Sequence, residues 1–188
     1  METPPDNQYE NAFDREKEKE RRQEIRKQLE LAISAPLKTE NFIREGKSKW
    51  TRKLEDKRAL VYLQRSVSSH AYYIEAGICE EKDIPEGKKI DIVYCDESSR
   101  HRLEHIAGYL YRLKHAGEED VEEKATTVVQ NIRDALSFDI PDGFEKYPGE
   151  YFFPSVSPEE VDKKIEIIQK AIEEYIPAWL KEKTYLNL

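Results

Sequence analysis

The fold is decided by the stretch from Trp50 to Glu81, which reads WTRKLEDKRALVYLQRSVSSHAYYIEAGICEE. Its apolar residues recur three and four positions apart, a period that is typical of one buried face of an α-helix. The residues of this apolar face are Leu60, Leu63, Val67, Ala71, Ile74 and Ile78. The spacing therefore predicts one long helix over residues 50–81.

Other segments of the chain show the same helical period. They lie at 10–34, 98–116, 119–138 and from residue 157 onward. Pro36 is expected to end the first of these helices, and Pro177 to bend or end the last. The last helix opens with a serine cap at Ser157 and a glutamate three residues later at Glu160, the pattern of a capping box.

These segments together predict an all-α fold, an antiparallel bundle of six or seven helices. Residues 90–94 could add at most one short strand, and an extended segment fits them equally well. The length of 188 residues suits one domain. We expect a disordered tail over residues 1–9 and a single helical domain over residues 10–188.

Charge and composition limit the partners and the cellular location expected for the protein. The net charge of −8 argues against nucleic-acid binding, because nucleic-acid-binding domains are usually basic. A net negative charge does not exclude a local basic face, however. Cys79 and Cys95 lie far apart in the sequence, which favours reduced thiols in a cytosolic protein. The polar start of the chain and the lack of a long apolar run predict no signal peptide, no membrane span and a cytoplasmic location.

Basic and aromatic residues suggest a surface for single-stranded nucleic acid. Arg58, Arg65 and Tyr72 recur every seven residues on the side of the predicted helix that faces away from its core. Cations that follow a phosphate backbone, together with an aromatic ring that stacks on bases, suit such a surface. The candidate residues are Lys53, Lys57, Arg58, Arg65 and Tyr72. An ordinary solvated helix face has the same pattern, so both interpretations stay open.

Two further motifs concern catalysis. The run from His101 to His105 fits the H-x-x-E-H pattern of some zinc proteases, but both histidines fall opposite the apolar face of their predicted helix, which favours solvated side chains. The pairs Arg65–His70 and Arg100–His105 fit the R-x4-H pattern of HEPN ribonucleases. On one continuous helix these side chains would diverge by about 140°. A metal-independent HEPN-type ribonuclease is kept as an alternative.

Four stretches, taken in order, resemble the translin and translin-associated factor X family. They are residues 22–27, 71–76, 104–112 and 132–138 followed by 160–173. The resemblance implies a helical bundle that assembles into a hollow oligomeric shell and binds single-stranded RNA or DNA inside it. The implied partners are therefore nucleic acid and either further copies of this chain or a translin-family subunit. The charged segment 10–34 and the aromatic run 151–153 agree with such contacts between subunits.

The resemblance also implies a metal-dependent endoribonuclease site in the X-type subunit, where carboxylates hold Mg²⁺. Glu75 and Glu104 occupy acidic positions of the family and are the candidate catalytic and metal-ligating residues. Tyr72 and Tyr109 stand where the family has glutamate. The incomplete carboxylate set favours a non-catalytic or weakly catalytic nucleic-acid-binding subunit. A helical interaction or regulatory module without nucleic acid is the alternative that the acidic composition favours.

Overall fold

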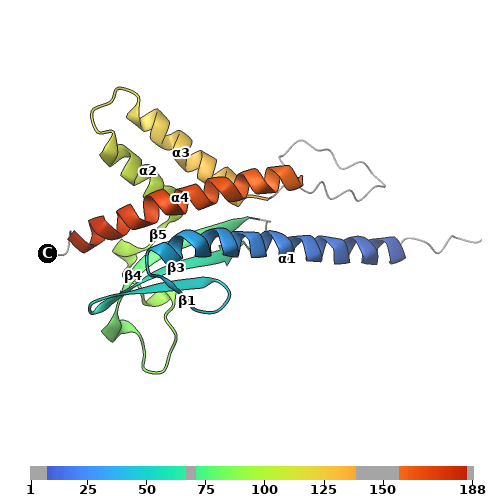
Figure 1. Cartoon of the computed structure of the whole chain (residues 1–188), viewed down its shortest axis with the longest axis horizontal. Helices are drawn as coiled ribbons and strands as arrows, with labels where there is room; N and C mark the ends of the chain where they lie inside the picture. The colour runs from blue at the N-terminus through green and yellow to red at the C-terminus, as the bar shows by residue number, and fades with distance from the viewer. Residues whose placement is uncertain (1–7, 67–70, 139–156, 186–188) are drawn as a thin grey trace, which may run out of the picture.

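The computed structural model describes residues 8–66, 71–138 and 157–185, which form a five-stranded antiparallel sheet and α-helices (Figure 1). The helices are α1 (Gln8–Thr39), α2 (Leu103–Lys114), α3 (Val121–Leu136) and α4 (Pro158–Tyr185). The strands are β1 (Ile43–Arg44), β2 (Lys49–Leu54), β3 (Lys57–Arg65), β4 (Tyr72–Glu80) and β5 (His101–Arg102). Three short 3₁₀ turns are η1 (Glu81–Asp83), η2 (Ile92–Tyr94) and η3 (Glu97–Ser99).

The prediction of an all-α bundle with at most one short strand is therefore wrong, and so is the resemblance to the helical translin family. The strands follow one another in the sheet in the order β1-β2-β3-β4-β5. Residues 50–81, the predicted central helix, contain nearly all of β2 and the whole of β3 and β4. Within the segment 90–94, Ile92–Tyr94 form the turn η2, and none of its residues lies in a strand.

The period of two in residues 57–80 explains why this segment forms strands. In β4, the side chains of Tyr72, Ile74 and Ala76 are buried on one face, while Tyr73 and Glu75 between them are only partly buried. Such alternation is the pattern of a strand with one face on a core. A two-residue turn joins β2 to β3, and its Glu55 has a positive φ of 51°. Positive φ at this position matches the twist of hairpin strands, so the turn sets the register.

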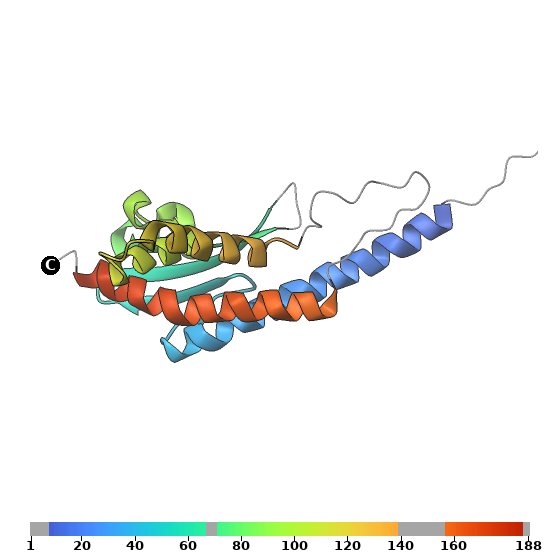
Figure 2. The ribbon, with the colours of Figure 1, turned by 90° about the horizontal axis from the view of Figure 1, so that it is seen from above.

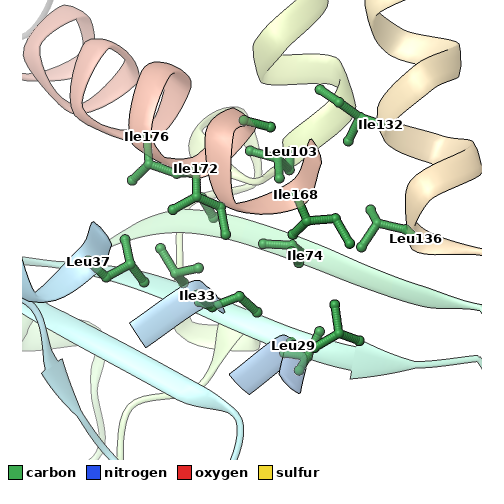
Figure 3. Close-up of a cluster of buried hydrophobic side chains, with 14 of the residues drawn as sticks. Leu29, Ile33, Leu37, Ile74, Leu103, Ile132, Leu136, Ile168, Ile172 and Ile176 are labelled. Carbon is green, nitrogen blue, oxygen red and sulfur yellow. The ribbon is translucent and has the colours of Figure 1, made fainter. Parts of the chain in front are cut away.

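One face of the sheet packs against the helices and contains the main core. Helices α1 and α4 run alongside each other over this face, and α2 and α3 form a hairpin that packs on α4 (Figures 1 and 2). Figure 3 shows the side chains converging from all four helices and from β4. The fully buried side chains of this core include Leu29, Ile74, Leu103, Ile168 and Ile172. Burial of apolar side chains on this scale is the main favourable term in folding.

A smaller cluster covers part of the opposite face of the sheet. The segment after β4 folds back there and packs Ile90 and Ile92 against Leu60 and Cys79. Gly77 has no room for a side chain, because an added Cβ would lie 2.9 Å from the Cβ of Cys95. Cys79 and Cys95 are joined in a disulfide, so the expectation of free thiols does not hold in this structure.

The other predicted helices are present, with shifted boundaries. Pro36 and Pro177 both lie inside helices, which continue to Thr39 and Tyr185, so neither proline ends its helix. The predicted cap of α4 is confirmed, because Ser157 Oγ accepts a hydrogen bond of 3.2 Å from the N–H of Glu160. The tail at 1–7 and the aromatic run 151–153 lie outside the described residues. Within the described residues, no helix is both long and apolar enough to cross a membrane.

The outer edge of β4 is completed by three separate pieces of chain. β5 pairs with it only at Glu75 and Ala76, and an isolated bridge joins Ala71 to Ser137 after α3. Farther along, the N–H of Asp96 donates to the carbonyl of Ile78 at 3.1 Å. The hydroxyl of Ser99 accepts from the N–H of Ile78 at 2.9 Å. The edge is therefore covered in sections, and residues 72–74 lie between two of them.

Replacing Ser99 with alanine tests this edge. The change leaves the buried N–H of Ile78 without its acceptor, which should lower the free energy of unfolding by about 1–3 kcal/mol. Urea unfolding followed by circular dichroism measures the loss. The neighbouring Ser98 is exposed, so Ser98→Ala is the matched control and should stay within about 0.5 kcal/mol of wild type. Equal stability of the two variants would contradict the role given to Ser99.

Candidate functional site

A pocket of about 410 Å³ lies at the sectioned edge of β4. It is bounded by β4 on one side, by β5 and the start of α2 on another, and by the end of α3 on the third. The residues that line it are Ala71, Tyr72, Tyr73, Arg102, Glu104, Arg133, Asp134, Leu136 and Ser137. This volume is within the range of small-molecule sites. The wall combines apolar and aromatic surface with four charged side chains.

Glu104 is the unusual residue of this pocket. It is the second residue of α2, and only 2% of its surface is exposed. Its Oε2 atom is buried and has no hydrogen-bond partner. The amide groups at the start of a helix favour a negative charge, which offsets part of the burial. An unsatisfied buried acceptor nevertheless destabilises a fold by about 1–3 kcal/mol, and by more when it is charged.

Arg102 separates this pocket from a second, shallower hollow of about 350 Å³. The guanidinium of Arg102 lies over the ring of Tyr73, 4.2 Å from its centroid, and 3.9 Å from Oε1 of Glu75. The second hollow is lined by Glu75, Glu97, Arg100, His101, Arg102 and His105. Arg102 therefore borders both hollows, while each of the two candidate carboxylates, Glu75 and Glu104, lines one of them.

Glu75 and Glu104 differ in how well they are satisfied. Glu75 lies on β4, where its Oε2 accepts a hydrogen bond of 2.6 Å from Nε2 of Gln64. Glu104 has no such partner at Oε2. Mg²⁺ requires several oxygen ligands around one point. Within the described residues, no group of three or more histidine, cysteine or acidic side chains is placed to hold a metal. This arrangement does not favour the magnesium site that the sequence suggested.

The predicted nucleic-acid residues do not form one row, because the segment is not a helix. Lys57 and Arg58 lie beside the β2–β3 turn and pair with Glu80 at 3.2 Å and Glu81 at 2.7 Å. Lys53 is exposed near the same turn. Arg65 stands at the other end of β3, roughly 23 Å from Arg58 along the strand.

Tyr72 is buried, so it does not form an exposed surface together with these basic residues. Only 6% of its surface is exposed, and its ring meets Phe138 edge to face with 5.9 Å between centroids. Burial also raises the pKa of Tyr72, so its hydroxyl is neutral at physiological pH. The structure thus places Tyr72 in the core and in the wall of the pocket, where its ring is not free to stack on a base.

The two histidine motifs fall across a change of secondary structure. His101 belongs to β5 and His105 to α2, so they do not share one helix face. For the same reason Arg100 and His105 line one hollow, although they would diverge on a continuous helix. Burial, followed by the charge of Lys183, lowers the pKa of His101, which keeps its ring neutral near pH 7.

Sequence reasoning missed the pocket as a site, and with it Tyr73, Arg102, Arg133 and Ser137. A local signal for Glu104 was nevertheless present. It precedes Ala107 and Gly108 by about one turn of helix. Small residues there allow α3 to approach closely, since an added Cβ at Gly108 would lie 2.6 Å from Val129. A glutamate beside such a close helix contact is expected to be buried.

The comparisons with known proteins bear on the same region of the chain. No curated protein and no solved structure matches the chain. A family model described as a domain of unknown function, DUF4304, matches residues 33–146, which is more than half of the chain. The match includes the whole sheet, α2, α3 and every residue that lines the pocket. The chain therefore belongs to the DUF4304 family.

Proposed function

We propose that this DUF4304 domain binds a small molecule that carries a positively charged nitrogen, and that Glu104 is the acceptor for it. The observation that supports the proposal is the buried Oε2 of Glu104, which lacks a partner beside a pocket of about 410 Å³. Hydrogen bonds from a cationic donor to a carboxylate are stronger than neutral ones. An ammonium or guanidinium group is thus the ligand group best suited to this oxygen.

The surroundings of the pocket favour a small occupant over an added strand. An extended peptide would have to pair along the free part of β4, yet that part is closed at Ala71 by the bridge to Ser137 and at Glu75 by β5. The interval between these two residues is about 14 Å along a strand. A compact molecule fits such an interval, whereas a longer peptide strand would collide with both ends.

Titration with butylamine, followed by ¹H–¹⁵N NMR, tests the proposal. Butylamine should shift the amide signals of residues 71–74 and 133–137, and butan-1-ol of similar size should not. Glu104→Gln removes the charge and keeps the shape, so it should weaken binding by about tenfold or more. Glu97→Gln, at an exposed residue of the neighbouring hollow, is the matched control and should bind butylamine like wild type.

The stability of Glu104→Gln distinguishes a binding role from a structural one. A carboxylate kept for a ligand is not required by the empty fold, so the variant should unfold at the same or a higher urea concentration than wild type. Butylamine binding that is equal in wild type and Glu104→Gln would overturn the proposal. So would a Glu104→Gln variant that loses several kcal/mol of stability, because Glu104 would then serve the fold.

Single-stranded nucleic-acid binding stays a prediction, as do an oligomeric assembly and magnesium binding by Glu75 and Glu104. A labelled single-stranded oligonucleotide, titrated at several salt concentrations, tests the first of these. Genuine phosphate contacts give an affinity that falls steeply as salt rises. The triple change of Lys57, Arg58 and Arg65 to alanine should then weaken binding. Equal binding by the variant would remove these residues from any nucleic-acid surface.

We also propose a cytoplasmic location, which the pairing of Cys79 with Cys95 makes directly testable. Cytosolic reductants keep most thiols free, whereas exported proteins retain disulfides. Alkylation in intact cells, before lysis, should therefore label both cysteines of a cytoplasmic domain. Complete protection of the two cysteines from alkylation, reversed by dithiothreitol, would place the domain in an oxidising compartment instead.

A further inference from the structure

The charges around the pocket suit a ligand with groups of both signs better than a simple cation. Two carboxylates, Glu104 and Asp134, and two guanidinium groups, Arg102 and Arg133, all line it. Asp134 accepts a hydrogen bond of 2.7 Å from Gln130, and Arg102 lies near Glu75 and over Tyr73. Among the described residues, Glu104 and Arg133 are left as the two charged side chains of the pocket that make neither a side-chain hydrogen bond nor an ion pair.

Glu104 and Arg133 also differ in depth. Glu104 is buried, whereas Arg133 is an exposed residue of the last turn of α3. The exposed rim carries two positive charges, Arg102 and Arg133, and one negative charge, Asp134, so it is net positive, while the inner wall carries the carboxylate of Glu104. A ligand with only a positive charge would meet repulsion from Arg133 and Arg102 as it enters. A ligand that also carries a negative group would have both of its charges matched.

We propose that the ligand of this pocket is a small zwitterion, with its cationic nitrogen on Glu104 and its carboxylate or phosphate group on Arg133, assisted by Arg102. This inference rests on the proposed function and extends it to the chemical class of the ligand. Arginine suits the outer contact because its planar guanidinium can donate two hydrogen bonds to one anionic group. The pocket would thus recognise an amino acid or a related amine that bears an acidic group.

A series of ω-amino acids tests both charges and their separation. Glycine, 4-aminobutanoate and 6-aminohexanoate vary the distance between the two groups, while butylamine and butanoate carry one group each. By NMR titration, the best-fitting amino acid should bind wild type about tenfold more tightly than butylamine, and butanoate should bind more weakly than either. O-Phosphoethanolamine, included in the series, shows whether the rim prefers phosphate to carboxylate.

Arg133→Gln is the decisive variant, and it should fold normally because the residue is exposed. It should lower the affinity for the amino acid by about tenfold and leave the affinity for butylamine unchanged or higher. Arg112→Gln removes the same charge from the α2–α3 hairpin, where Arg112 pairs with Glu122 away from the pocket, and should bind like wild type.

The outcomes separate this inference from the proposed function. Butylamine that binds as tightly as every amino acid, and that depends on Glu104, would overturn the zwitterion and keep the cation site. An amino-acid preference that survives Arg133→Gln would likewise exclude Arg133 as the anion contact. Absence of binding by every compound in the series, or binding that ignores Glu104→Gln, would overturn both.

Discussion

The fold depends on the pairing of β3 with β4, since β4 has a full-length partner on that side alone. Nine residue pairs, from Lys57–Glu80 to Arg65–Tyr72, fix the register and place Ala59, Ile74 and Ala76 under the helices. The other side of β4 is covered in sections by β5, by Ser99 and by the bridge to Ser137. A sheet edge left open is a site for unwanted association, and short protected sections avoid it. Between the bridge at Ala71 and the pairing of β5 with Glu75, this edge of β4 has no strand partner among the described residues, and the pocket lies there.

The sequence predicted the helices better than the sheet, and the reason lies in residues 50–81. Leu60, Leu63, Ile74 and Ile78 satisfy a helical spacing by chance, while Ala59-Val61-Leu63 and Tyr72-Ile74-Ala76 satisfy the period of two that the fold uses. Short apolar runs fit both periods. The turn that would have decided between them is Glu55-Asp56, which lacks the glycine or asparagine typical of hairpins. Strand content also depends on pairing between distant segments, which local spacing does not reveal.

The site was predictable only in fragments. Glu104 was chosen as a candidate, but for a metal site shared with Glu75, and the structure assigns the two to different hollows. Tyr72 was chosen as an exposed ring, yet it is buried against Phe138. Arg133 and Ser137 reach the pocket because α3 ends beside β4, a contact between segments more than sixty residues apart in the sequence. No motif within either segment predicts this contact between them.

The segment that matches the family contains the pocket but not helix α4, which stabilises the same fold. The pocket residues fall between Ala71 and Ser137, inside the segment that matches the family, whereas α4 lies outside that segment. Yet α4 contributes Ile168, Ile172 and Trp179 to the core, each with almost no exposed surface. Burial of a large apolar side chain stabilises a fold by about 1.5–3 kcal/mol. Helix α4 can therefore offset the destabilisation that an unsatisfied Glu104 causes, since a fold with ample apolar burial tolerates a binding residue that its empty state does not need.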